Sequence, residues 1–154
     1  THIWQASNTM PRQAAIDCGI AFQLTNILRD VATDAQQGRI YIPHCEFERF
    51  NVSPVLWLQG NPDGDWSGLI QSVAARAELL YCTGWETMQF LPAPGQRVFS
   101  LMWRYYHELL NQVCRSREQL WNRKRLRIST VTRARLAAQH FISPLYWTLP
   151  SPTF

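Results

Sequence analysis

Apolar residues recur along this chain every three or four positions, which is the spacing of residues on one face of an α-helix. This pattern predicts helices over residues 11–37, 45–50, 54–58, 69–90, 96–117 and 131–141. The alternation of apolar and polar residues that is typical of half-buried strands, with hairpin turns between them, is absent from the sequence. The predicted fold class is therefore all-α.

The first predicted helix, residues 11–37, carries an apolar stripe that we expect to face the core. The stripe consists of Ile16, Ile20, Leu24, Ile27, Leu28 and Val31. Asn8 or Thr9 can cap the start of this helix, and Pro11 suits its first turn. Gly38 is suited to its end, because glycine accepts the left-handed conformation that often terminates a helix.

Turn-forming residues separate the later helices. Residues 59–68 include Asn-Pro-Asp-Gly-Asp and form the clearest predicted loop. Pro92 and Pro94 are predicted to end the helix over residues 69–90, because proline disrupts a helix interior. The proline-containing end, residues 143–154, is predicted to be a tail outside the packed domain.

The composition is that of an ordered globular domain, with 154 residues, 46% hydrophobic residues and 17% charged residues. The net charge is +4, and the excess of positive charge is concentrated between Arg115 and Arg135. This segment contains eight basic residues and one acidic residue, Glu118. A basic segment of this kind can face nucleic acid, anionic lipid or a small anion, or it can be a solvated helix end.

The four cysteines are far apart and form no zinc-binding pattern with each other or with histidine. They are Cys18, Cys45, Cys82 and Cys114. Their apolar neighbours indicate reduced, mostly buried thiols, which favours a cytoplasmic location. Membrane attachment through a spanning helix is not predicted, because the sequence contains no apolar run of sufficient length.

Four polar residues share one row of the first predicted helix. They are Gln23, Asn26, Asp30 and Asp34. Steps of three, four and four residues place these side chains along one helical face. Two carboxylates four residues apart repel each other, whereas a divalent cation between them would attract both. Magnesium prefers oxygen ligands and commonly uses one or two carboxylates with substrate phosphates. From spacing alone, the row fits either a magnesium-diphosphate site or an ordinary exposed face.

The surrounding residues are more specific than the spacing. The segment from Gln23 to Val31, Gln-Leu-Thr-Asn-Ile-Leu-Arg-Asp-Val, is followed by Asp34 and by Gly-Arg-Ile-Tyr-Ile-Pro at residues 38–43. This pattern resembles the second aspartate-rich signature of the squalene/phytoene synthase family, and weaker similarity extends over about residues 12–135. The resemblance identifies residues 1–142 as the C-terminal portion of a synthase domain, part of an isoprenoid-synthase-type helical bundle.

Members of that family join two prenyl diphosphates head to head. The resemblance therefore implies Mg²⁺-dependent condensation of farnesyl or geranylgeranyl diphosphate, with a squalene-, dehydrosqualene- or phytoene-type product in isoprenoid or carotenoid biosynthesis. It implies that Asn26, Asp30 and Asp34 ligate magnesium on a diphosphate. Gln23 is expected beside the same diphosphate.

Other residues have two interpretations each. Arg29 and Arg39 can clamp diphosphate oxygens, or they can form surface ion pairs. The resemblance places Tyr106 near the reacting carbons, where its ring can stabilise a cation, and the alternative is a packed core tyrosine. Arg125 or Arg127 can reach a diphosphate from the basic segment.

The chain departs from the family in containing only one aspartate-rich helix, whereas family members place two on opposite sides of a cavity. It also does not begin with Met. We therefore expect a fragment that lacks the N-terminal half of the bundle and is inactive by itself.

Two interpretations of other classes remain open. One is a non-catalytic helical subunit that keeps the fold without the chemistry. The other is a basic nucleic-acid binder, which the absence of helix-turn-helix and zinc signatures disfavours. The expected partners are thus prenyl diphosphates and the missing half of the bundle rather than nucleic acid. The expected location is cytoplasmic, with peripheral membrane association left open.

Overall fold

The computed structural model describes residues 12–121 and 126–142, and over these residues it contains helices and no strand. The predicted all-α class is confirmed. The α-helices are α1 (Arg12–Gln36), α2 (His44–Arg49), α3 (Pro54–Leu58), α4 (Trp66–Gly84), α5 (Ala93–Arg115) and α6 (Thr130–Ile142). Two 3-10 helices, η2 (Trp85–Phe90) and η3 (Arg117–Gln119), follow α4 and α5.

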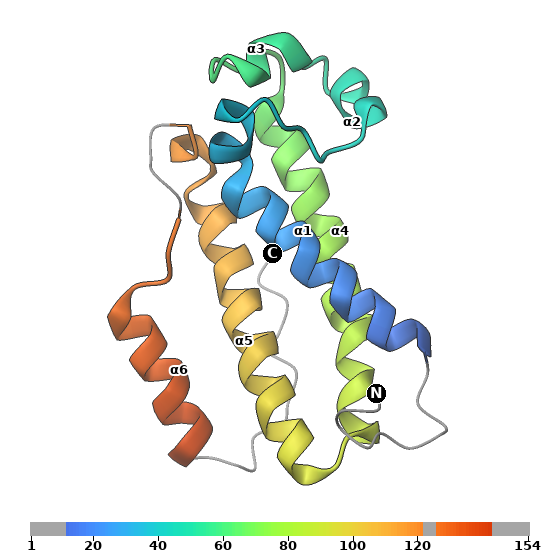
Figure 1. The fold of residues 1–154 in the computed structure, drawn as a ribbon, viewed down its shortest axis with the longest axis vertical. Coiled ribbons are helices and arrows are strands. Elements are labelled where there is room, and N and C mark those ends of the chain that lie inside the picture. The colour runs from blue at the N-terminus through green and yellow to red at the C-terminus, as the bar shows by residue number, and fades with distance from the viewer. Residues whose placement is uncertain (1–11, 122–125, 143–154) are drawn as a thin grey trace.

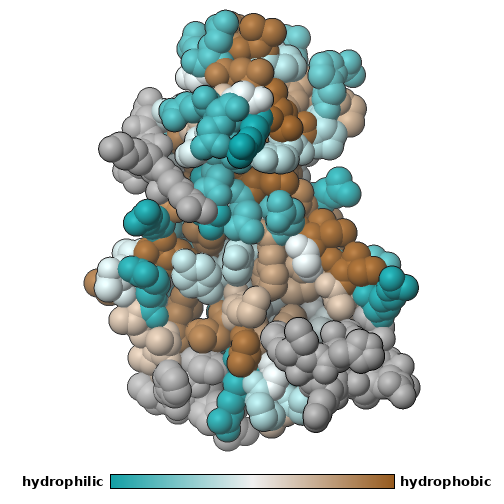
Figure 2. Space-filling model, viewed as in Figure 1, coloured by the Kyte–Doolittle hydropathy of each residue, from teal (hydrophilic) through white to brown (hydrophobic). Residues whose placement is uncertain are grey.

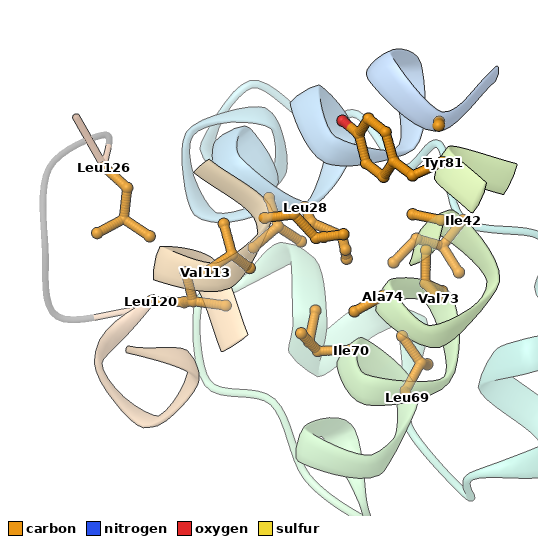
Figure 3. Close-up of a cluster of buried hydrophobic side chains, with 14 of the residues drawn as sticks. Leu28, Ile42, Leu69, Ile70, Val73, Ala74, Tyr81, Val113, Leu120 and Leu126 are labelled. Atoms are coloured by element: carbon orange, nitrogen blue, oxygen red, sulfur yellow. The ribbon is translucent and has the colours of Figure 1, made fainter. Parts of the chain in front are cut away.

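The three long helices form the body of the structure, with α1 lying across the antiparallel pair α4 and α5 (Figure 1). The short helices α2 and α3 cover one end, and α6 packs along the outer side of α5. The core lies where the long helices meet. Figure 3 shows Leu28 of α1 pointing into the space between Val113 of α5 and Ile70 and Ala74 of α4.

Helix α1 approaches α4 through small side chains. The buried residues of α1 are Ala14, Cys18, Ala21, Thr25, Leu28, Val31, Ala32 and Ala35. The contact is closest at Gly84, where an added Cβ would lie only 2.8 Å from the Cα of Cys18. A real Cβ does not come this close to another carbon, so a residue without a side chain is required here.

This close contact corrects the predicted apolar stripe. Leu28 and Val31 are buried as predicted, but Ile16 and Ile20 are 42% and 38% exposed. Large side chains would hold the α1 and α4 backbones apart, and the small residues therefore take the core side of α1. The isoleucines lie on the opposite side, where they form an exposed apolar row.

Several predicted boundaries also shift. Helix α4 begins at Trp66 rather than residue 69, because the Asp65 carboxylate accepts a hydrogen bond from the Gly68 amide at 2.8 Å and caps the helix. Pro94 does not end a helix but lies in the first turn of α5, where no amide donor is needed. The short helix α3 has the predicted bounds.

The thiol prediction is only partly right. Cys18 is buried and Cys114 is half-buried, but Cys45 and Cys82 are exposed. Burial raises the pKa of the Cys18 thiol to about 12. No helix in the described part of the chain is both long and apolar enough to cross a bilayer. The predicted cap at Asn8 or Thr9, the candidate Arg125 and the tail 143–154 lie outside the described residues.

Candidate functional site

The predicted polar row lies on the side of α1 opposite the buried Cys18, Ala21 and Leu28. Ile16, Ile20, Gln23, Ile27, Asp30 and Asp34 follow one another in steps of three or four residues. They therefore form one line along the helix, apolar at its start and acidic at its end. Figure 2 shows this change as brown residues over the first half of α1 and teal residues over its second half.

Asp30 is held by the residue before it. Arg29 donates from Nε to Oδ1 of Asp30 at 2.9 Å and from Nη2 to Oδ2 at 2.5 Å. Both side chains are largely buried, with 15% and 20% of their surfaces exposed. This hydrogen bonding raises the pKa of Arg29, although partial burial opposes the shift. The two-point contact fixes the orientation of the Asp30 carboxylate.

The donors in the row fit a magnesium ion that is shared with phosphate. Asn26 Oδ1 is buried and accepts no hydrogen bond, which leaves an oxygen available to a cation. Asp30 and Asp34 supply two carboxylates four residues apart. No cluster of three or more acidic, histidine or cysteine side chains suited to a metal occurs among the described residues. A cation at this row therefore needs further oxygen ligands. Mg²⁺ commonly takes such ligands from water and substrate phosphates.

A basic cavity adjoins this row. It has a volume of about 320 Å³ and is lined by Arg29, Tyr105, Leu109, Leu126, Arg127, Ile128 and Arg133. Three arginines and, among the residues that the structure describes, no acidic residue line it, so it favours an anion. Arg29 connects the polar row with the cavity, because it donates a hydrogen bond to Asp30 and also lines the cavity.

Local structure explains how Arg127 and Arg133 reach the cavity. Leu126 and Ile128 are buried on either side of the exposed Arg127. The Arg127 carbonyl accepts a hydrogen bond from Gln112 of α5 at 3.3 Å. The Ser129 hydroxyl accepts a hydrogen bond from the Thr132 amide at 3.1 Å and thereby caps α6. Arg133 follows Thr132 in the first turn of this helix.

The sequence did not single out Tyr105 or Arg133 as site residues. The concentration of basic residues between Arg115 and Arg135 was the available signal for Arg133. Arg39 is exposed in the turn after α1 and does not line the cavity. Its amide instead donates to the Asp34 carbonyl at 2.9 Å. The structure thus joins Arg29, but not Arg39, to the basic cavity.

Tyr106 lies at the edge of the site rather than deep in the core. Its side chain is half-buried, and its ring centroid is 4.7 Å from that of Phe22 on α1. Tyr106 follows Tyr105, which lines the basic cavity together with Arg29. The aromatic pair and the polar row therefore occupy the same region between α1 and α5.

Buried polar contacts connect α1, α4 and α5 on the core side of this region. The Thr25 hydroxyl donates to the Ala21 carbonyl at 2.9 Å, and its oxygen lies 2.8 Å from the Tyr81 hydroxyl. Because Thr25 has one hydroxyl proton, Tyr81 is the donor of the second bond. His107 of α5 pairs with Glu78 of α4 at 2.8 Å and packs its ring edge-on against Tyr81. These contacts fix the three long helices relative to one another.

The family of the chain follows from comparison with known proteins. Residues 1–132 match the family model described as squalene/phytoene synthase. The chain belongs to this family. It is 35% identical to the phytoene synthase of Arthrospira platensis over 115 residues, which are 74% of this chain and 37% of that protein. It is 32% identical to the phytoene synthase of Mycobacterium tuberculosis over 152 residues, which are 94% of this chain and 50% of that protein.

A solved structure agrees with this assignment of the fold. A dehydrosqualene synthase, crystallised with a ligand, superimposes with a TM-score of 0.69 at 29% sequence identity. The superposition covers 83% of this chain and 45% of the synthase. The chain thus spans half or less of the length of these relatives, and it has the helical fold of a squalene/phytoene synthase over that part.

Proposed function

We propose that this chain forms one side of the active site of a head-to-head prenyl synthase, which condenses two prenyl diphosphates to a phytoene- or squalene-type product. The observation that carries the proposal is the double role of Arg29. One residue bonds a carboxylate of the polar row and lines a cavity with two further arginines. A magnesium diphosphate needs this combination, because its metal seeks carboxylates while its phosphate oxygens seek guanidinium groups.

The polar row is the proposed metal site. Asn26, Asp30 and Asp34 would hold Mg²⁺ together with diphosphate oxygens, and Gln23 would lie beside the same group. When bound, the ion would neutralise negative charge on the leaving diphosphate. Asp30 is suited to this role because Arg29 already restricts its orientation, so less entropy is lost on binding.

The basic cavity is the proposed diphosphate site. Arg29, Arg127 and Arg133 would donate hydrogen bonds to phosphate oxygens, and Tyr105 belongs to the same lining. Arg39 would act from outside this lining, in the turn after α1, where it is exposed. Guanidinium groups favour this ligand because they stay charged at any physiological pH and bind two oxygens at once.

The chemical role of these residues is to favour departure of diphosphate. The allylic C–O bond breaks, its electron pair leaves with the diphosphate, and a positive charge remains on the allylic carbons. The arginines stabilise the departing anion, and the ring of Tyr106 presents negative π-density to the cation. The double bond of a second prenyl diphosphate then supplies the electrons of the new C–C bond.

We propose that residues beyond this chain supply the other side of the cavity. Ile16 and Ile20 are exposed, whereas Ile27 is half-buried and lines a second cavity with residues of α4. A helical partner with its own carboxylates would cover the isoleucines and complete the metal site. We therefore propose that the chain acts with the N-terminal half of a synthase and is inactive without it.

Product analysis tests the proposal. The chain is incubated with geranylgeranyl or farnesyl diphosphate and Mg²⁺, alone and after co-expression with the N-terminal half of a phytoene synthase relative. We expect a head-to-head hydrocarbon or cyclopropyl diphosphate only from the combined halves. Asp30→Asn should lower turnover by roughly a hundredfold or more, because a metal contact contributes several kcal/mol to the transition state.

The matched control for Asp30→Asn is Glu86→Gln, which removes an exposed carboxylate from η2, away from the site. Its turnover should equal that of the unmodified protein. Normal turnover of Asp30→Asn would remove this residue from the mechanism. Turnover by the chain alone would contradict the need for a second half, and a non-catalytic subunit would give no product in either case.

A further inference from the structure

The second cavity, which Ile27 helps to line, lies between α1, α2 and α4. It has a volume of about 220 Å³ and shares no lining residue with the basic cavity. None of the residues proposed above to bind metal or diphosphate lines it. Pockets for drug-sized ligands start at roughly 300 Å³, so a cavity of this size suits a smaller metabolite.

One side of the second cavity is apolar and well packed. Leu24 and Ile27 of α1 are half-buried there, whereas Ile42 and Val73 are buried. Ile42 belongs to the connection after α1 and lies next to Val73 of α4 (Figure 3). Contacts between separate elements therefore hold this side in place. A short aliphatic group that packs against it would be removed from water, which favours binding.

The polar side contains a carboxylate oxygen without a hydrogen-bond donor. Oε2 of Glu46 is buried and accepts no hydrogen bond from any residue that the structure describes. Nη1 of Arg49 is 3.7 Å from this oxygen, which is too long for a hydrogen bond, and the Arg49 side chain is 66% exposed. An unsatisfied buried acceptor is unfavourable, so a ligand that brings an N–H donor to Glu46 would gain binding energy.

A guanidinium group of α4 lines the same cavity. Arg76 is exposed and forms no hydrogen bond or ion pair with another residue in the described part of the chain. Its charge is therefore available to an anionic group. The second cavity thus combines an unsatisfied anion, an available cation and an apolar side within a volume that one small molecule can span.

We propose that the second cavity binds an amino acid with a branched aliphatic side chain, such as leucine. The ammonium group of the ligand would donate to Glu46, and its carboxylate would accept from Arg76. Its side chain would pack against Leu24, Ile27 and Val73. Each charged group of the ligand then meets a group of opposite charge. The site goes beyond the proposed condensation and does not depend on it.

Ligands with a single charge suit the second cavity less well. A purely anionic ligand would leave Glu46 without a donor and would place two negative charges close together. A purely cationic ligand would leave Arg76 without a partner and would add a third positive charge beside those of Arg49 and Arg76. A zwitterion avoids both costs.

An NMR titration of the ¹⁵N-labelled full chain tests the site. The probes are L-leucine, 4-methylpentanoate, which lacks the ammonium group, and 3-methylbutylamine, which lacks the carboxylate. Leucine should shift the amide signals of Ile42 and Ser72, which line the cavity, but not those of Tyr105 and Arg133. Each analogue should bind at least roughly threefold more weakly than leucine, because it loses one charge-assisted contact.

Two variants assign each charge to its partner. Glu46→Gln should weaken leucine binding by roughly tenfold, because this contact is buried, and should bind 4-methylpentanoate no more weakly than the unmodified chain does. Arg76→Gln should weaken leucine binding by roughly threefold, because its contact is exposed, and should not weaken binding of the amine. Glu48→Gln and Arg97→Gln are the matched controls, since both residues are exposed and neither lines the cavity.

The proposal is overturned if leucine leaves the amides of the second cavity unshifted, or if 4-methylpentanoate binds as tightly as leucine. Equal losses of leucine affinity in Arg76→Gln and Arg97→Gln would also overturn it, because they would indicate general charge attraction. A variant that loses its dispersed NMR spectrum has unfolded, and the three probes on the unmodified chain then decide. None of these outcomes affects the proposed condensation, whose residues lie outside this cavity.

Discussion

The close contact of α1 with α4 can be tested by adding one carbon atom. In Gly84→Ala, the new Cβ would lie 2.8 Å from the Cα and Cβ of Cys18 and 2.9 Å from its amide nitrogen. Two of these three atoms belong to the α1 backbone, which cannot rotate away as a side chain can. Gly84 has φ −63° and ψ −27°, so alanine fits its backbone conformation and the cost comes from the contact alone.

The magnitude follows from two opposing effects. Overpacking a tight contact typically costs about 1–3 kcal/mol. Replacing glycine by alanine in a helix returns up to about 1 kcal/mol. We therefore expect Gly84→Ala to lower the free energy of unfolding by about 1–2 kcal/mol. The same displacement would move the polar row of α1 relative to Tyr106, so the site depends on this glycine.

Gly19 provides the matched control within the neighbouring helix. It lies in α1, it is exposed, and a Cβ added there would meet no atom within 4 Å. Gly19→Ala should therefore raise the free energy of unfolding by about 0.5–1 kcal/mol through helix propensity. The same chemical change thus has opposite signs at two positions of one helix pair.

Urea unfolding followed by far-UV circular dichroism measures both variants. The midpoint and slope of each transition give the free energy of unfolding and show whether the denatured state has changed. The reasoning is refuted if Gly84→Ala is as stable as the unmodified chain, or if both variants change in the same direction. In either case α1 and α4 would not be in backbone contact at Cys18.

Three further predictions concern the cavity and the thiols. Arg133→Ala should weaken pyrophosphate binding in calorimetry by roughly tenfold, because a hydrogen bond to a charged group contributes about 1.5 kcal/mol or more. Arg135 does not line the cavity, so Arg135→Ala should have little effect. Equal losses in the two variants would point to general charge attraction. Burial raises the pKa of Cys18 from 9.0 to about 12, so its contribution to stability is complete below pH 9 and is lost as the pH rises towards 12. Urea unfolding between these pH values should show a smaller decline for Cys18→Ala, and an unchanged decline would exclude Cys18 as its source. In the native chain, a thiol reagent should modify Cys45 and Cys82 but not Cys18.

The sequence by itself determined the helices and the acidic row. Apolar spacing is a local property, and it was sufficient to predict an all-α fold and the bounds of α3. The positions of Gln23, Asn26, Asp30 and Asp34 on one side of α1 follow from helical geometry alone. The residues around them, from Gln23 to Pro43, indicated the family that the comparison over residues 1–132 shows.

Only the tertiary structure decided which side of α1 is buried. The sequence favoured the isoleucines, because side-chain size is the usual signal of burial. The structure instead buries alanines and exposes Ile16 and Ile20, since Gly84 permits a backbone contact that large residues would prevent. The exposed row matters for function, because it is the surface that continues into the polar row.

The basic cavity and the contact between Phe22 and Tyr106 also could not be predicted from local sequence patterns. Arg29 comes from α1, Tyr105 from α5 and Arg133 from α6, so the cavity exists only when three helices are packed. Phe22 and Tyr106 likewise meet across two helices at 4.7 Å. Periodicity specifies which face of a helix a residue occupies, but it carries no information about the helix opposite. Contacts between distant segments are set by the shape of the whole core, and these contacts make the polar row a candidate site.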